Sequence, residues 1–337
     1  MDSAPAVPDA ASTHAAGIPL AGPPPRRIRA VIWRVLIILF FTGVATLIFA
    51  RARQVDWEAV GDALAGYTAF ELGLAFVAAA LGHLCSGSYD LIGRWYTGHF
   101  MPRRRVFAIN AIAYAFSLNL GALVGGWAFR VRLYTRFGLP VAVVARIIVL
   151  AVVTNWSGFT LLAGLLLLFW PPALPEAWNI PVVAIRGVGV LMLAIIGAYL
   201  AACVIGRRRG WTCRVRGQQM RMPTLPMAAA QLSLSSVSWL LMTVSLWMLL
   251  PAHLTFVRVI EALFACSIAG AALHVPGNVG VLEGSFTTLM ATDLDEVQAL
   301  AGILAFRAVY FLVPFAAAAV GYGFMEVFAR RHRKTKG

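Results

Sequence analysis

His274-Val275-Pro276-Gly277-Asn278-Val279-Gly280-Val281-Leu282-Glu283-Gly284 interrupts one of the most apolar parts of the chain. Proline removes a backbone donor, and glycine loosens a helix on either side. Backbone groups freed at membrane depth persist only where protein or a watery cavity satisfies them, and a carboxylate there is costly. We therefore interpret the stretch as a broken, re-entrant element that lines a polar site. The alternative is a kinked span with Glu283 at its watery end.

The composition indicates an all-α polytopic membrane protein. Of the 337 residues, 60% are apolar and 12% are charged, and the mean hydropathy is +0.79. A soluble domain carries about twice that share of charged residues. The net charge of +14 is what an excess of Lys and Arg in cytoplasmic loops produces. No soluble basic domain with interleaved aromatic residues is present, so we expect no nucleic-acid partner.

Six apolar segments are long enough to cross a bilayer. They are residues 31–50, 69–92, 141–170, 182–205, 227–250 and 300–328. Residues 106–129 and 256–290 are also apolar, but glycines and polar residues interrupt both. We expect one membrane domain over residues 26–331, with a disordered cytoplasmic tail at 1–25 and a basic cytoplasmic tail at 332–337.

The positions of the arginines choose between two topologies. If all eight apolar segments cross, Arg130, Arg132, Arg136, Arg146 and the six arginines between 207 and 221 lie outside, against the positive-inside rule. If residues 106–129 and 256–290 each return to the side they entered, nearly every basic loop and both termini are cytoplasmic. Residues 31–170 and 182–328 then form an inverted-topology repeat. Transporters with such repeats hold their substrate at the repeat interface.

Two arginines in the apolar segments are candidates for chemistry. Arg130 follows the Gly125-Gly126 pair and either holds a lipid phosphate with its planar fork or snorkels as a cytoplasmic anchor. Arg307 lies well inside the last span, where an arginine costs about 2.5–3.5 kcal/mol. It should therefore face the interior and pair with Glu283, either as a functional or as a purely structural ion pair.

Other polar residues have simpler explanations. Asp90 precedes Arg94 by one helical turn, so a local ion pair is sufficient. His83 is more readily a satisfied polar group than a proton carrier. The four cysteines have no metal-ligand spacing, and the chain has no HExxH, Walker A or GxSxG motif. We expect no catalytic residue, no metal and no cofactor.

Three motifs carry a resemblance to a known family. They are Asn119-x-Gly121 with Gly125-Gly126, Arg130-x-Arg132-x-Tyr134 and Gly138; Pro276-Gly277-Asn278-Val279-Gly280-Val281-x-Glu283-Gly284; and Arg307-x-x-Tyr310-x-x-x-Pro314. Over about Arg27 to Arg331 the chain resembles the lysylphosphatidylglycerol synthase transmembrane-region family. The resemblance implies the flippase half of the multiple peptide resistance factor, which moves aminoacylated phosphatidylglycerol between leaflets. Asn278 replaces a common glycine of the family. The chain ends at Gly337 without the soluble aminoacyl-transfer domain, so we do not expect synthase activity.

We expect a bacterial inner-membrane lipid translocase, or lipid-transport factor, for a lipid with a polar or phosphate-bearing headgroup. A scaffold for a lipid-modifying enzyme and an intramembrane headgroup enzyme are the alternatives. Membrane lipids, anionic ones included, are the expected partners, and self-association is left open. The candidate substrate-binding residues are Asn119, Gly121, Gly125, Gly126, Arg130, Arg146, Pro276, Gly277, Asn278, Gly280, Glu283, Arg307 and Tyr310.

Overall fold

The computed structural model describes residues 55–172, 181–215, 218–273 and 275–334, together with Thr42, Thr46 and Arg53. One compact unit begins at Asp56. The predicted tail at residues 1–25 lies outside the described residues, as does nearly all of the predicted span at 31–50.

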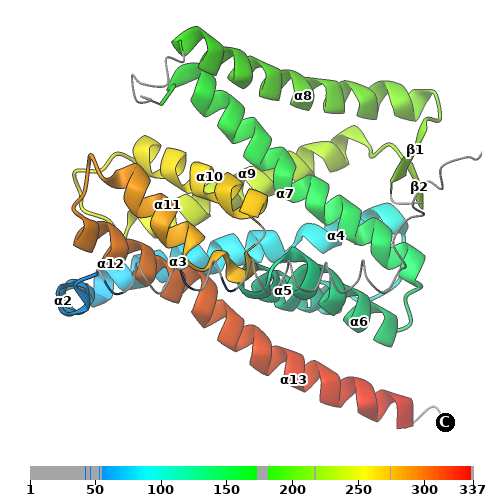
Figure 1. The fold of residues 1–337 in the computed structure, drawn as a ribbon. Coiled ribbons are helices and arrows are strands. Elements are labelled where there is room, and N and C mark those ends of the chain that lie inside the picture. The colour runs from blue at the N-terminus through cyan, green and yellow to red at the C-terminus, as the bar shows by residue number, and fades with distance from the viewer. Residues whose placement is uncertain are drawn as a thin grey trace, which may run out of the picture. The chain divides into compact units, whose positions relative to one another are not determined.

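Long apolar helices make up most of the unit that begins at Asp56 (Figure 1). In chain order they are α2 (Trp57–Ala65), α3 (Ala69–Gly87), α4 (Tyr89–Thr97), α5 (Arg103–Leu120), the π-helix η1 (Ala122–Ala128), α6 (Phe129–Arg136), α7 (Val141–Phe169), α8 (Val182–Arg208), α9 (Leu225–Trp247), α10 (Phe256–Leu273), the 3-10 helix η3 (Pro276–Asn278), α11 (Val281–Met290), α12 (Glu296–Phe306), the π-helix η4 (Arg307–Leu312) and α13 (Val313–Lys334).

Six helical stretches within the described residues are long and apolar enough to cross a membrane. They are Ala69–Thr97, Val141–Phe169, Val182–Arg208, Leu225–Trp247, Phe256–Leu273 and Glu296–Met325. The predicted helical membrane fold is confirmed at this level. Five of the stretches correspond to predicted spans, and the sixth, Phe256–Leu273, is the first half of a segment that we predicted to be re-entrant.

The first interrupted segment is a helical hairpin. Gly121 adopts a positive φ of 85°, which glycine tolerates, and α5 ends there. η1 then packs back against α5, with Gly125 so close to the carbonyl of Phe116 that a side chain would not fit. The two outer ends of the hairpin also meet, because the Arg105 guanidinium lies 4.7 Å from the centre of the Phe137 ring. The chain therefore enters and leaves this hairpin at the same end of the molecule.

The second interrupted segment has the same form. α10 and α11 pack against each other, and η3 joins them. At their outer ends, Arg258 Nε donates to Asp293 Oδ2 at 3.0 Å, and Arg258 Nη2 donates to the carbonyl of Leu289 at 2.6 Å. The start of α10 and the end of α11 are therefore held side by side.

A short β-hairpin follows α8, within a fold that is otherwise helical as we predicted. β1 (Thr212–Val215) and β2 (Gln218–Arg221) pair antiparallel. Strand pairing gives the backbone of this basic loop its hydrogen bonds. The Tyr96 hydroxyl donates to the carbonyl of Arg221 at 2.8 Å, which attaches the hairpin to the end of α4.

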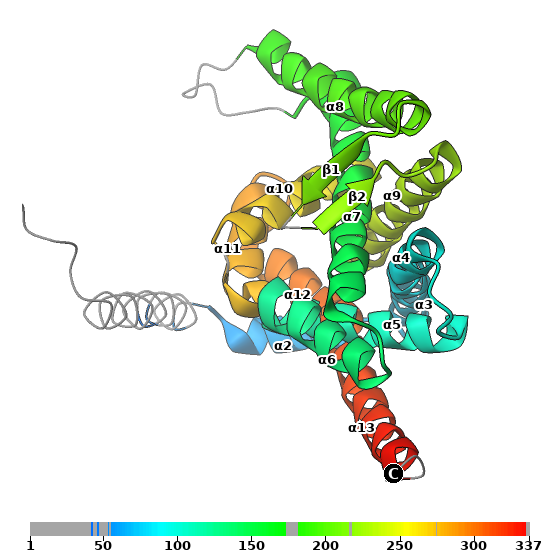
Figure 2. The same ribbon diagram turned by 90° about the vertical axis from the view of Figure 1, so that its right-hand side faces the viewer.

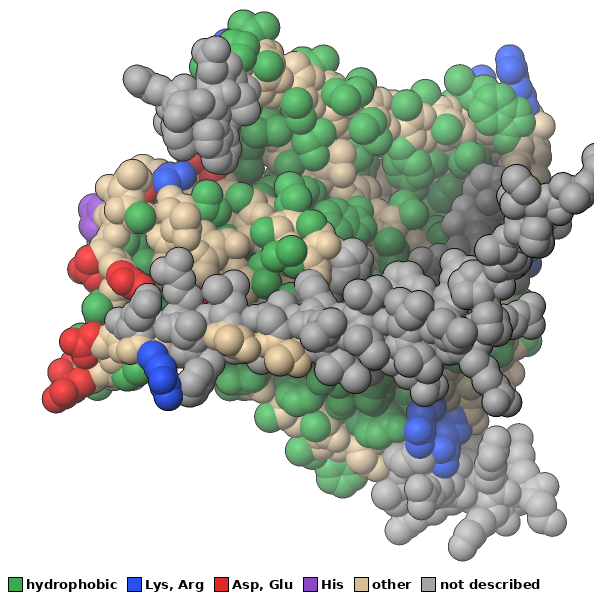
Figure 3. Space-filling model, viewed as in Figure 1, with side chains coloured by type: hydrophobic (Ala, Val, Ile, Leu, Met, Phe, Trp, Pro, Cys, Tyr) green, Lys and Arg blue, Asp and Glu red, His purple; other side chains and the backbone are tan. Residues whose placement is uncertain are grey.

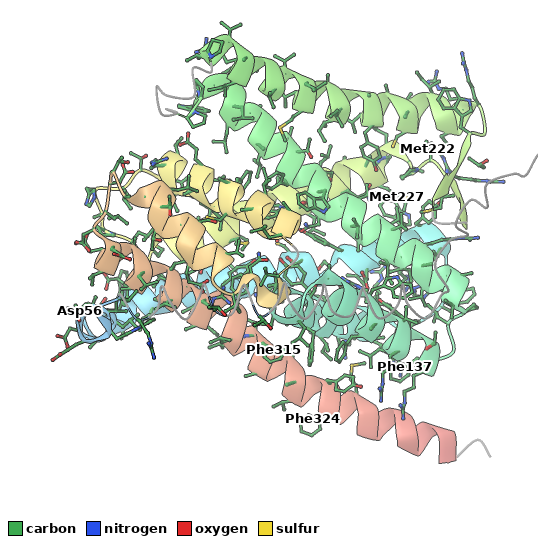
Figure 4. The ribbon with its side chains drawn as sticks, viewed as in Figure 1. Asp56, Phe137, Met222, Met227, Phe315 and Phe324 are labelled. Atoms are coloured by element: carbon green, nitrogen blue, oxygen red, sulfur yellow. The ribbon has the colours of Figure 1, made fainter. Side chains whose placement is uncertain are left out.

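Charge is sorted between the two ends of the helices. Acidic side chains gather at the left end, near α2 and the start of α12, whereas arginines mark the end of α8 at the right (Figure 3). Asp56 lies at the left end, and Phe137 and Met222 lie toward the right end (Figure 4). The helix ends and connections at the right end carry Arg103, Arg104, Arg105, Arg132, Arg136, Arg207, Arg208, Arg209 and Arg221. We call the right end of the helices the basic end and the left end the acidic end.

Small residues and buried polar groups hold the long helices together, as is usual between helices in membranes. Gly158 of α7 packs directly on Ser235 of α9, and Gly164 of α7 packs on Gly189 of α8. The amide of Gln231 on α9 donates to Thr154 Oγ1 on α7 at 3.0 Å. These contacts position α7 and α9 as the frame beside which the two hairpins lie.

Candidate functional site

The break between α10 and α11 has an unusual backbone. Gly277, Asn278 and Gly280 adopt positive φ angles of 65°, 51° and 76°. Asparagine is one of the few residues other than glycine that tolerates this region. Its side chain packs directly on Gly270 of α10, where an added Cβ would overlap the amide. Asn278 therefore keeps the turn and fills the space beside α10.

Glu283 uses its two carboxylate oxygens for two different partners. Oε2 accepts a hydrogen bond from the backbone N–H of Gly280 at 2.8 Å and so caps the first turn of α11. Oε1 lies 2.5 Å from Nε of Arg307. The predicted Glu283–Arg307 ion pair is confirmed.

Arg307 also binds the broken backbone itself. Nη1 donates to the carbonyl of Gly277 at 3.0 Å, and Nη2 donates to the carbonyl of Asn278 at 3.2 Å. Carbonyls freed by a helix break at membrane depth need such donors. The side chains of Arg307 and Glu283 are 13% and 16% exposed, so the pair is partly accessible.

The π-helix η4 begins at Arg307 and has a definable cause. Pro314, seven residues further on, has no N–H to donate to the carbonyl of Tyr310. His83 Nε2 on α3 lies 2.9 Å from that carbonyl, and Asn119 Nδ2 on α5 donates to the carbonyl of Phe311 at 3.1 Å. Since a carbonyl only accepts, Nε2 of His83 carries the proton. His83 is thus a satisfied polar group, as we predicted.

The two helix breaks meet at Asn119 and Gly277. A Cβ added to Gly277 would lie 2.6 Å from the carbonyl oxygen of Asn119, which directly precedes the break at Gly121. The same Asn119 side chain contacts η4. The structure therefore brings together seven of the predicted site residues. They are Asn119, Gly277, Asn278, Gly280, Glu283, Arg307 and Tyr310, the last through its backbone carbonyl.

Arg130 belongs to a second buried cluster. Its Nε donates to Asp90 Oδ2 at 3.2 Å, and its Nη2 donates to Asn110 Oδ1. The Tyr134 hydroxyl donates to the same Asp90 oxygen at 2.8 Å. Asp90 is fully buried and Arg130 is 7% exposed, so Arg130 is not a snorkelling anchor.

The predicted local pair between Asp90 and Arg94 is wrong. Arg94 Nε instead donates to the carbonyl of Met101 at 2.8 Å, and the carboxylate of Asp90 points to α6. The sequence did contain a signal for the correct partner. Asp90 and Arg130 are both costly alone at membrane depth, as are Glu283 and Arg307.

Three of the remaining predicted residues, Gly125, Gly126 and Arg146, pack elsewhere in the fold. Gly125 and Gly126 allow η1 to pack on Phe116 and Ser117 of α5. Arg146 is half-buried near the start of α7, at the basic end, and its Nε has no hydrogen-bond partner among the described residues. In the part of the chain that the structure describes, no cluster of His, Cys, Asp or Glu could hold a metal ion.

These features define a polytopic helical membrane protein with a compensated charge pair at the junction of two broken helices. The chain belongs to the lysylphosphatidylglycerol synthase TM region family, which it matches over residues 31–318. It is 36% identical over 301 residues to "Inner membrane protein YbhN" of Escherichia coli K12, covering 89% of this chain and 94% of that protein. It is 29% identical over 293 residues to "Uncharacterized protein slr0712" of Synechocystis, covering 85% of this chain and 89% of that protein.

Proposed function

We propose that this protein moves a lipid with a polar or phosphate-bearing headgroup across the bacterial inner membrane. The observation that carries the proposal is the Glu283–Arg307 pair, which lies where the two broken helices meet and remains partly exposed. Membership of a family named for lysylphosphatidylglycerol supports a lipid-related role.

The chemistry of the pair suits a transient headgroup. Arg307 forms an ion pair with Glu283 and donates hydrogen bonds to two backbone carbonyls. Its planar guanidinium also suits phosphate oxygens. A phosphate that competes with Glu283 for Arg307 would keep the arginine paired, and the displaced carboxylate would keep its hydrogen bond from the N–H of Gly280. Release would restore the ion pair, so neither state needs an uncompensated arginine.

The proposed topology has six full spans, two re-entrant hairpins and cytoplasmic termini. Both hairpins have their outer ends in contact, and charge is sorted to opposite ends of the helices. By length alone α10 could cross the membrane. The Arg258–Asp293 contact favours a chain that returns to the side it entered, because the contact holds the end of α11 at the side where α10 starts. We therefore place the basic end in the cytoplasm and the two repeats in opposite orientations.

Cysteine labelling tests the topology. In a cysteine-free background, single cysteines at Arg132 and Arg209 should react with impermeant maleimide only from the cytoplasmic side. A cysteine at Asp295 should react only from outside. Labelling at Arg132 from outside would replace the hairpin by a single full span.

Translocation is measured in proteoliposomes that contain phosphatidylglycerol with a headgroup-proximal fluorophore. We expect the labelled lipid of the inner leaflet to become accessible to dithionite faster in vesicles with the protein than in protein-free vesicles. The Glu283→Gln, Arg307→Gln double variant should not accelerate it. A rate equal to that of protein-free vesicles for folded wild-type protein would favour a scaffold instead.

A further inference from the structure

A groove on the membrane-facing side of α4 and α9 is separate from the Glu283–Arg307 pair. Its volume is about 470 Å³, and Ser88, Leu91, Trp95, Ala230, Leu234 and Val237 are among the residues that line it. We propose that it binds one acyl chain of an anionic phospholipid of the inner leaflet, whose headgroup lies at the arginines of the basic end. This lipid is a bound component and not the transported substrate.

The groove exists because the first candidate span is kinked. Before the kink, α3 is held against α9: Ser86 Oγ lies 2.7 Å from Ser238 Oγ, and Ser245 Oγ donates to the carbonyl of Ala75 at 2.9 Å. α3 ends at Gly87, and α4 starts after Ser88 on a new course.

Beyond the kink α4 leans on α7 instead of α9. Gly93 packs directly on Ile147 of α7, where an added Cβ would lie 2.9 Å from its Cγ2 atom. Ala230, Leu234 and Val237 of α9 form one wall of the opening between α4 and α9, and this opening is the groove. In Figure 2, α9 and the pair α3 and α4 lie on the same side of the molecule.

The position of the groove within the membrane spans and the residues that line it indicate what it binds. Both walls belong to candidate membrane spans, Ala69–Thr97 and Leu225–Trp247, so the surrounding solvent is lipid. The lining is apolar apart from two serines, of which Ser88 donates its hydroxyl to the carbonyl of Leu84 within its own helix. An unfilled concave surface would lose its dispersion contacts, and an acyl chain supplies them.

The residues at the rim of the groove indicate a preference for an anionic headgroup. Trp95 is 54% exposed at the end of the groove nearest the basic end, and tryptophan favours the headgroup level of a bilayer. Arg94 precedes it in the chain, and the Tyr96 hydroxyl bonded to the carbonyl of Arg221 brings exposed Arg221 beside it. Each arginine near an anionic membrane surface contributes about 1 kcal/mol of attraction.

The test is native mass spectrometry of the full chain in detergent with palmitoyl-oleoyl phosphatidylglycerol or phosphatidylcholine. Ala230→Phe fills the groove, whereas Ala229→Phe places the same ring on an exposed position of α9 outside it. Retention of phosphatidylglycerol should fall roughly tenfold in Ala230→Phe, because losing about ten carbon–carbon contacts of about 0.1–0.2 kcal/mol each costs about 1.4 kcal/mol. Ala229→Phe should retain the lipid as wild type does, and phosphatidylcholine should bind wild type more weakly.

Each outcome decides a part of the proposal. Equal retention by the two phenylalanine variants would overturn the groove as the site. Equal retention of both lipids by wild type, or no effect of Arg221→Gln on their ratio, would overturn the anionic headgroup. If Ala230→Phe does not fold, the contact is tested in vesicles of acyl-brominated phosphatidylglycerol. Bromine should quench the tryptophan fluorescence of wild type more than that of Trp95→Phe. Equal quenching would refute contact between Trp95 and the acyl chain. Translocation is not a readout here, so the result stands independently of the proposed transport.

Discussion

The Glu283–Arg307 pair offers a sharp test by a double-mutant cycle. Glu283→Gln keeps an oxygen that can accept from the N–H of Gly280, so the cap on α11 is retained, but Arg307 loses its counter-charge. Breaking a fully buried pair costs 3–5 kcal/mol, and because these side chains are 13% and 16% exposed we expect about 2 kcal/mol.

Arg307→Gln should cost more than Glu283→Gln. It leaves the carboxylate unpaired and also removes the donors to the carbonyls of Gly277 and Asn278. With roughly 1 kcal/mol for each lost hydrogen bond, the expected cost is about 4 kcal/mol.

The double variant carries no lone charge and lacks only the two donors. We expect it to cost about 2 kcal/mol, against about 6 kcal/mol if the two changes were independent, which gives a coupling near 4 kcal/mol. The free energy of unfolding is measured by denaturant titration in lipid–detergent micelles. A coupling below about 0.5 kcal/mol would refute an energetically important pair. Translocation should remain lost in the double variant although it folds, and normal transport there would make the pair purely structural.

Two glycines in the same segment make a matched comparison. Gly277→Ala should destabilise by at least about 2 kcal/mol, since its φ is 65° and the new Cβ would lie 2.6 Å from the Asn119 carbonyl, whereas Gly284→Ala meets open space and should be neutral or stabilising by up to about 1 kcal/mol. Thermal midpoints check this, and equal shifts would contradict the strained turn. His83→Ala should cost about 1–3 kcal/mol by leaving the carbonyl of Tyr310 without its donor, and His83→Gln should cost less. If the two His83 variants are equally stable, that hydrogen bond does not compensate for Pro314.

Much of the fold followed from local properties of the sequence. Runs of apolar residues predicted the long helices, and the Pro276–Gly280 turn predicted where one of them breaks. We predicted the other break at Gly125-Gly126, whereas the structure has it at Gly121. The Glu283–Arg307 pair was also predictable, because a lone charge in a membrane is costly and these two residues lie close in the chain. For the helices and their breaks, the free energy depends on the residues of one segment and the solvent around it.

Tertiary structure decided which distant groups satisfy one another. Asp90 pairs with Arg130 and not with Arg94, because the hairpin of α5, η1 and α6 brings Arg130 beside α4. His83 serves the carbonyl that Pro314 leaves without a donor, and Asn119 meets Gly277 where the two breaks touch. The sequence indicates which groups need a partner, because each buried charge or freed carbonyl needs one. The identity of the partner depends on which helices pack together, and hydropathy and spacing along the chain do not determine that packing.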